Sequence, residues 1–180
     1  MSSDRGEARQ RLFFALWPDE DVRLTLDQAA GKLLGKRVKR VIAPNLHITL
    51  AFAGSVSTAV RTCLERAADD IRVPCFELSI DRVGHWPGPR IFWVAPTHIP
   101  AELWSLAGAL RQAFEGCDIE PDTRPYQPHI TLARKANKVP ESAGFPPLHW
   151  SISHFSLVES VTDPAGVRYH VLRSWALGSG

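Results

Sequence analysis

A pentapeptide that carries two chemically active side chains occurs twice in the sequence. The residues HITLA stand at positions 47–51 and again at positions 129–133. In an extended strand successive side chains point to opposite faces, so the His and the Thr of each copy share one face. The Ile and the Leu point to the other face, where they can enter a hydrophobic core. Each copy is therefore predicted to be a strand that presents an imidazole beside a hydroxyl.

The duplication favours a functional interpretation over a structural one. A single histidine on a strand is usually a structural residue. A repeat that preserved only the fold would need the apolar positions alone, whereas here both the histidine and the threonine recur. Two similar lobes related by a pseudo-twofold axis would bring the two faces opposite each other. The pattern predicts one small site that holds two imidazoles and two hydroxyls.

Two imidazoles suit acid–base chemistry at phosphorus. With unperturbed pKa values of about 6.5, one ring can be neutral while the other is protonated near neutral pH. One ring then activates a nucleophile and the other protonates the leaving oxygen, while threonine hydroxyls donate hydrogen bonds to the non-bridging oxygens. The sequence contains no nucleophilic Ser or Cys motif, no carboxylate cluster for two metals, and no HExxH or paired-Cys zinc motif. We therefore expect neither a cofactor nor a metal.

The composition fits a globular protein with a small anionic ligand. The 180 residues include 21 Lys or Arg and 19 Asp or Glu, a net charge of +2, and 44% of them are hydrophobic. A balance so near neutral argues against a protein that grips long nucleic acid through its backbone. The apolar stretch at 12–17 is too short to span a bilayer, and no signal peptide is recognised. We expect a cytoplasmic monomer that associates with no membrane.

The cysteines indicate a reducing environment. Cys63, Cys75 and Cys117 stand singly, their number is odd, and no CxxC pair occurs. Such usage predicts free thiols in the cytosol, with neither a disulfide framework nor a zinc site.

Hydrophobic periodicity and turn residues predict mixed strands and helices. Residues 1–10 are polar and expected to be flexible, and residues 11–180 show no linker, so they are expected to form a single two-lobed domain. Strands are predicted at 11–17, 45–52, 76–83, 90–95, 128–133, 149–160 and 167–177, and helices at 19–34, 57–71 and 100–114. Short hairpin connections favour antiparallel pairing. The predicted class is α+β.

Four stretches of the chain together resemble the two-histidine phosphoesterase superfamily. They are RLFFAL, NLHITLAFAG, RPYQPHITLAR and YHVLRSWAL, and the resemblance covers about residues 11–177. Within that superfamily the chain is similar to the bacterial RNA 2′,3′-cyclic phosphodiesterases, also called 2′-5′ RNA ligases. The resemblance implies a bilobal fold in which two antiparallel sheets face a central cleft and the helices lie outside.

The resemblance also implies roles for five residues. His47 would be the general acid and His129 the general base, and Thr49 and Thr131 would hold the phosphate. Arg134 matches a basic position that reaches the substrate phosphate or nucleotide in the family. It lies five residues after His129, so a regular strand would turn it to the opposite face, and only a local twist or bulge would aim it at the cleft.

Several other residues are weaker candidates. Arg124 is a second basic residue near the second motif. The basic turn of Lys36, Arg37, Lys39 and Arg40 is interpreted as a solvated surface, or else as a contact with an RNA backbone at the rim of the cleft. Phe13 is expected in the core, with stacking on a base as the alternative. His85 and Trp86 lie in a Gly/Pro-rich segment that is interpreted as a loop, where a ligand contact is one reading. Surface or structural roles are expected for the remaining histidines, His98, His149, His154 and His170.

The combined hypothesis is an enzyme that hydrolyses RNA 2′,3′-cyclic phosphate ends, or small cyclic nucleotides, without a metal. By the resemblance, the 3′ oxygen leaves and a 2′-phosphomonoester remains. The same site run in reverse would join a 2′-phosphate or cyclic phosphate end to a 5′-hydroxyl, an activity expected to be weak because water is abundant. The alternative is a binding module for nucleotides or RNA ends that keeps the cleft without turnover.

Overall fold

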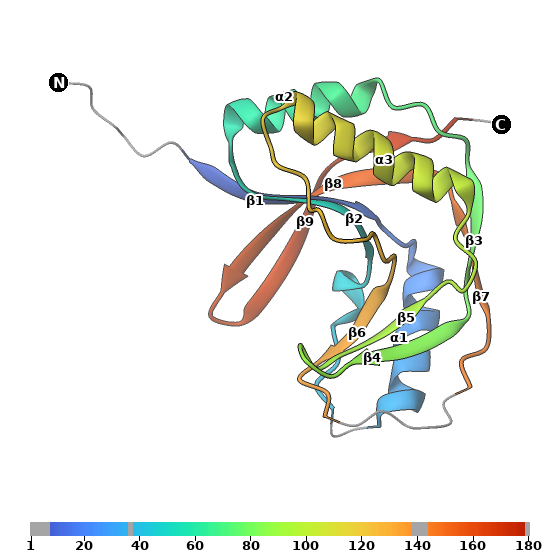
Figure 1. Cartoon of the computed structure of the whole chain (residues 1–180). Helices are drawn as coiled ribbons and strands as arrows, with labels where there is room; N and C mark the ends of the chain where they lie inside the picture. Colours follow the sequence, from blue (N-terminus) through green and yellow to red (C-terminus); the bar gives the residue numbers. More distant parts are fainter. Residues whose placement is uncertain (1–7, 36–37, 138–143, 179–180) are drawn as a thin grey trace.

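The computed structural model describes residues 8–35, 38–137 and 144–178. Within these ranges the chain forms a seven-stranded antiparallel sheet of order β4-β5-β6-β2-β1-β8-β9, a two-stranded sheet β3-β7 and three α-helices (Figure 1). The strands are β1 (Arg9–Leu16), β2 (Ile48–Ser57), β3 (Phe76–Ile80), β4 (Arg82–Trp86), β5 (Ile91–Ala95), β6 (Ile130–Arg134), β7 (Leu148–Ile152), β8 (His154–Asp163) and β9 (Gly166–Ala176). The helices are α1 (Glu20–Leu34), α2 (Thr58–Asp69), α3 (Ala101–Gly116) and the 3₁₀ turn η1 (Ala43–Asn45). The α+β class and the antiparallel sheets are confirmed.

The seven-stranded sheet consists of two halves that meet at the duplicated motif. Strands β2 and β6 carry the two copies, and a single residue pair, Ile48 with Ile130, joins them. On one side of this pair lie β4 and β5, and on the other lie β1, β8 and β9. The two motif strands are thus neighbours within one sheet, not members of separate sheets. The second sheet consists of β3 and β7 alone, which pair with each other and with no strand of the large sheet.

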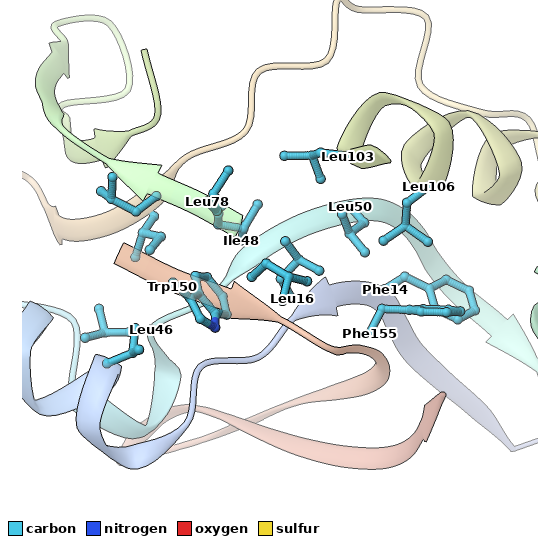
Figure 2. Close-up of a cluster of buried hydrophobic side chains, with 14 of the residues drawn as sticks. Phe14, Leu16, Leu46, Ile48, Leu50, Leu78, Leu103, Leu106, Trp150 and Phe155 are labelled. Carbon is cyan, nitrogen blue, oxygen red and sulfur yellow. The ribbon is translucent and has the colours of Figure 1, made fainter. Parts of the chain in front are cut away.

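The two faces of the large sheet differ in character. One face is covered by the three α-helices, whose buried side chains form one core with those of β1, β2 and β6. Figure 2 shows part of this core, with Ile48 and Leu50 of the first motif beside Leu103 and Leu106 of α3. The other face carries a separate small cluster of Phe13, Ala15 and Val158. The helices therefore leave the histidine face of the sheet uncovered.

The helix termini follow from local capping residues. Asp19 precedes α1 and its side chain accepts a hydrogen bond from the Val22 amide, while Ser57 caps α2 through the Val60 amide. Pro100 stands just before α3, where its missing amide hydrogen costs nothing. These three helices occupy the predicted segments to within a few residues.

Two predicted strands are each divided in the structure. The chain changes sheets at Asp81, because β3 pairs with β7 whereas β4 pairs with β5. The segment at 149–160 likewise divides at Ser153 into β7 and β8. The predicted loop around His85 and Trp86 is wrong, since both residues belong to β4. The apolar alternation shifts by one residue at each break, since Val83 follows Ile80 and Phe155 follows Ile152 by three positions.

The expectation of three free thiols is wrong for two of the cysteines. Cys63 in α2 and Cys117 at the end of α3 form a disulfide, with their Cα atoms 5.8 Å apart. Cys75 is free and exposed. The two bonded residues lie 54 positions apart in the sequence, and only the packing of α2 against α3 brings them together.

The close approach of Trp93 to Gly84 yields a prediction about stability. The two residues are paired across β4 and β5, and a methyl group on Gly84 would overlap the Trp93 ring. Gly84→Ala should therefore lower the free energy of unfolding by about 1–3 kcal/mol through overpacking, as measured by denaturant titration. Gly88→Ala is the matched control, because no atom lies within 4 Å of its added carbon. Equal stability of the two variants would contradict this account.

Candidate active site

A cleft of about 1170 Å³ lies over the junction of β2 and β6 on the sheet face away from the helices. Its lining includes His47, Thr49, His129 and Thr131, so the structure brings both copies of the motif into one cavity. Strand pleating accounts for this arrangement. The intervening residues Ile48 and Ile130 are fully buried in the core, so the His and Thr on either side of each point to the opposite face. The sequence prediction that the two copies form one site agrees with this geometry.

Both motif strands contain a bulge at the same position. Thr49 and Ala51 pair with consecutive residues of β1, which leaves Leu50 without a partner. In the second copy Thr131 and Ala133 pair with consecutive residues of β5, which leaves Leu132 without a partner. A bulge reverses the alternation of the side chains that follow it. The repeat therefore extends beyond sequence to the local backbone.

The bulge at Leu132 explains how Arg134 reaches the cleft. Arg134 lines the cavity together with His129 and Thr131, although its offset from His129 is odd. The extra residue in β6 supplies the local distortion that the sequence argument required. At the equivalent position of the first copy stands Phe52, which also lines the cleft and is 45% exposed. The guanidinium of Arg11 lies over the Phe52 ring at 4.8 Å.

Backbone contacts orient both imidazoles in the same way. His47 Nδ1 lies 2.7 Å from the carbonyl oxygen of Asn45, and His129 Nδ1 lies 2.8 Å from that of Gln127. A carbonyl oxygen only accepts hydrogen bonds, so Nδ1 carries the proton in both neutral rings. Each Nε2 then has a lone pair free for chemistry. The Thr49 hydroxyl lies 3.1 Å from His47 Nε2 and can donate to it.

Three aromatic rings surround the imidazole of His47. Trp17, directly after β1, stacks on it with a centroid distance of 5.3 Å and an interplanar angle of 16°. Phe13 of β1 lies at 5.0 Å and Tyr169 of β9 meets the ring edge-on at 5.1 Å. Phe13 thus packs behind the site, as expected of a buried residue. His129 has one aromatic neighbour in the described chain, Trp86 of β4 at 4.6 Å.

This asymmetry separates the two histidines electrostatically. Burial lowers the pKa of His47 from 6.5 to about 4, against a smaller raising effect of the Asn45 carbonyl and with further lowering by the charges of His129 and Arg134. Burial also lowers the pKa of His129, partly offset by the Gln127 carbonyl and reinforced by Arg134. Removing water disfavours an imidazolium. At neutral pH the His47 ring of the unliganded protein is therefore neutral.

The weaker sequence candidates separate into two groups. Lys39 and Arg40 line the cleft, whereas Lys36 and Arg37 lie outside the described residues. Arg124 forms an ion pair with Asp122 and does not line the cleft. His85 donates from its Nε2 to the Ala136 carbonyl oxygen, 2.8 Å away. The remaining histidines, His98, His149, His154 and His170, lie outside the cleft lining.

Sequence reasoning missed the residues that enclose the histidines. Trp17 directly follows β1 and Tyr169 lies in β9, and neither belongs to the repeat. The sequence did point to Phe52, because it occupies the position in the first copy that Arg134 occupies in the second. A comparison of the two copies beyond the pentapeptide would have identified it.

In ranges 8–35, 38–137 and 144–178 no group of three or more His, Cys, Asp or Glu side chains is placed to hold a metal ion. In the same ranges no helix has the length and apolar character needed to cross a bilayer.

Comparison with known proteins gives consistent relationships. A family model described as the 2′-5′ RNA ligase superfamily matches residues 18–164. The chain is 36% identical over 173 residues to the RNA 2′,3′-cyclic phosphodiesterase of Escherichia coli (strain K12), covering 93% of this chain and 97% of that protein. It is 32% identical over 184 residues to the RNA 2′,3′-cyclic phosphodiesterase of Thermus thermophilus, covering 93% of this chain and 90% of that protein.

Solved structures agree with these sequence matches. A crystal structure of E. coli LigT complexed with 3′-AMP superposes with a TM-score of 0.84 at 32% identity, covering 94% of this chain and 99% of that one. A crystal structure described as a phosphoesterase gives a TM-score of 0.86 at 32% identity, with the same coverage.

The stacking of Trp17 on His47 yields a prediction about pH. Trp17→Leu admits water to the imidazole, which favours its charged form, so the pKa of His47 should rise from about 4 by about one unit. At pH 5 a larger fraction of His47 is then protonated than in the parent protein. NMR titration of the imidazole protons measures both histidines in one experiment.

His129 serves as the internal reference, because it does not touch Trp17, and its pKa should move much less. Trp104→Leu is the matched control, since Trp104 of α3 contacts Tyr126 and neither histidine. An unchanged pKa of His47 in Trp17→Leu would show that the stacked ring does not contribute to its desolvation.

Proposed function

The chain belongs to the 2′-5′ RNA ligase superfamily, and on this premise we propose that it is an RNA 2′,3′-cyclic phosphodiesterase. It hydrolyses the cyclic phosphate at an RNA end and leaves a 2′-phosphomonoester. The observation that carries this proposal is the meeting of two His–Thr pairs, with matching bulges and matching tautomers, in one cleft. Catalysis needs no metal, because both proton transfers are assigned to imidazoles.

The two histidines act as base and acid at their Nε2 atoms. His129 accepts a proton from water as the water oxygen bonds to phosphorus, and His47 donates a proton to the 3′ oxygen as its bond to phosphorus breaks. This assignment of roles follows the family resemblance. Each Nδ1 remains bonded to a backbone carbonyl throughout, which keeps the reactive Nε2 aimed at the cleft. Exchange of protons with solvent then restores the starting state.

The low pKa of His47 requires that the substrate itself promote protonation. In the unliganded protein, burial and the positive charge of Arg134 both disfavour the imidazolium. A bound phosphodiester brings a negative charge beside the ring and compensates that of Arg134. Both changes raise the pKa of the imidazole. We infer that His47 takes up its proton when the cyclic phosphate binds.

The remaining groups of the site hold the phosphate and the base. Thr49 and Thr131 donate hydrogen bonds to the non-bridging oxygens, whose charge grows during attack, and Arg134 adds a cation. Phe52, with Arg11 over its ring, offers an exposed surface on which a nucleobase can stack. The partner is thus an RNA end or a cyclic nucleotide. Monomeric state, cytoplasmic location and organisation as a single two-lobed domain stay predictions from the sequence.

The reverse reaction uses the same groups. A 5′-hydroxyl in place of water would attack the cyclic phosphate and form a 2′-5′ linkage. Water is present at far higher concentration, so this ligation is a weak secondary activity. A binding module without turnover would keep the cleft but would not need two imidazoles in the same tautomer.

Replacement of the histidines tests the proposal directly. His47→Ala and His129→Ala should each lower kcat/KM on an RNA with a 2′,3′-cyclic phosphate end by about two to four orders of magnitude, the usual contribution of a positioned acid or base. The double variant should lose less than the product of the two losses, because the pair acts as a unit. Product analysis by chromatography identifies the phosphomonoester formed.

His154→Ala is the control for these variants, since His154 lies outside the cleft and bonds to Ser153. Its turnover should match that of the parent protein. Near-parental rates in either His47→Ala or His129→Ala, or parent protein that binds the substrate without turnover, would refute the proposal.

The threonines provide a second test. A hydroxyl bonded to a charged phosphoryl oxygen contributes about 1.5–3 kcal/mol, so Thr49→Ala and Thr131→Ala should each slow turnover about ten- to a hundredfold. Thermal melting checks that the fold is retained. Thr62→Ala is the control, because that hydroxyl bonds within α2 to the Thr58 carbonyl. Full activity of Thr49→Ala or Thr131→Ala would make the threonines merely strand residues.

A further inference from the structure

The positive charges of the cleft are not balanced by acidic side chains in its lining. In the part of the chain that the structure describes, no Asp or Glu lines the cavity, whereas five basic residues do, namely Arg11, Lys39, Arg40, Arg134 and Lys135. The sequence as a whole carries a net charge of only +2. The cleft therefore carries a local excess of positive charge, which acidic residues elsewhere in the protein offset.

Four of these five basic residues lie at the end of β6. Arg40 forms a bridge with Ala133, and the Val41 amide donates to the Leu132 carbonyl at 2.8 Å. In an antiparallel pair the residue before Arg40 lies opposite the residue after Ala133, which places Lys39 beside Arg134. Lys135 follows directly. Arg40 itself is committed to Asp27, 2.9 Å away.

Lys135 has a backbone conformation that a lysine rarely adopts. Its φ is 58°, in the left-handed region, where a residue with a Cβ is strained. The buried Ala136 holds the turn, since its amide donates to the Arg90 carbonyl at 3.0 Å and its own carbonyl contacts His85. The turn leaves Lys135 exposed along the lining of the cleft.

Lys39 and Lys135 lie beyond the threonines, at the Arg134 end of the cleft. Lys135 follows Thr131 by four residues, which at about 3.3 Å per extended residue sets an upper limit of about 13 Å between their backbones. The cleft, at about 1170 Å³, also exceeds the roughly 300–1000 Å³ typical of pockets for small molecules. Both quantities leave room for a second phosphate beyond the one at the histidines.

We propose that Lys39 and Lys135 form a phosphate-binding subsite for the RNA backbone on the 5′ side of the reacting end. The inference rests on the proposed function and specifies its substrate as the end of an RNA strand several nucleotides long. A cyclic mononucleotide has no upstream phosphate and leaves this subsite empty. The enzyme therefore favours an oligonucleotide end over the corresponding mononucleotide.

Kinetics with two substrates test the subsite. The kcat/KM of the parent protein is measured on a tetranucleotide with a cyclic phosphate end and on the matching cyclic mononucleotide. In the Lys39→Gln/Lys135→Gln double variant the ratio of the two values should fall about fivefold, as for loss of two exposed charge contacts. In the parent protein the same ratio should fall about sevenfold between roughly 50 and 200 mM salt, because each contact to a single strand contributes a logarithmic slope of about 0.7. Lys32→Gln, on α1 and outside the cleft lining, is the control.

A binding measurement separates failure of the subsite from failure of the proposed function. Fluorescence anisotropy follows a labelled tetranucleotide that ends in a 2′-phosphate, the product, which requires no turnover. If the parent protein hydrolyses neither substrate but binds this product in a lysine-dependent manner, the subsite stands and the proposed function falls. If hydrolysis proceeds but the double variant keeps the parental substrate ratio, salt dependence and product affinity, the subsite is wrong.

Discussion

The site depends on one pair of buried isoleucines, Ile48 and Ile130, which joins the two halves of the large sheet. Hydrogen-bonded pairing between β2 and β6 does not extend past this pair, so the strands diverge on either side of it. The divergence opens the cleft, and the pair fixes how the two His–Thr faces meet. Backbone contact at a single point therefore provides both the cavity and its alignment.

The matching bulges decide what surrounds the reacting groups. A strand without a bulge would turn Arg134 and Phe52 toward the core, where a guanidinium carries a large desolvation cost. Because Leu50 and Leu132 are unpaired, the side chains of Phe52 and Arg134 point into the cleft beside the threonines. The two copies then diverge in use, because one places a cation there and the other an aromatic ring. The duplicated backbone thus supports an asymmetric site.

Burial and charge act in the same direction on the histidines. The rings of Phe13, Trp17 and Tyr169 shield much of His47 from water, and Arg134 adds a positive charge nearby. Both effects keep the imidazole neutral until an anion arrives. The same excess of positive charge favours that anion. Under the proposed function, binding of the phosphate would therefore promote protonation of His47.

The sequence by itself determined the repeated His–Thr pairs, their common face, the α+β class and the positions of the three helices, because these depend on local periodicity and capping. It did not determine that the chain passes from the small sheet into the large one at Asp81 and Ser153, nor that Cys63 meets Cys117, since strand partners and helix contacts are non-local. The sequence identified Arg134 as a candidate but did not determine the direction of its side chain. That direction requires a bulge, and the bulge depends on pairing with β5. Only the tertiary structure placed Trp17 on His47, because no pattern in the sequence records which rings pack behind a histidine.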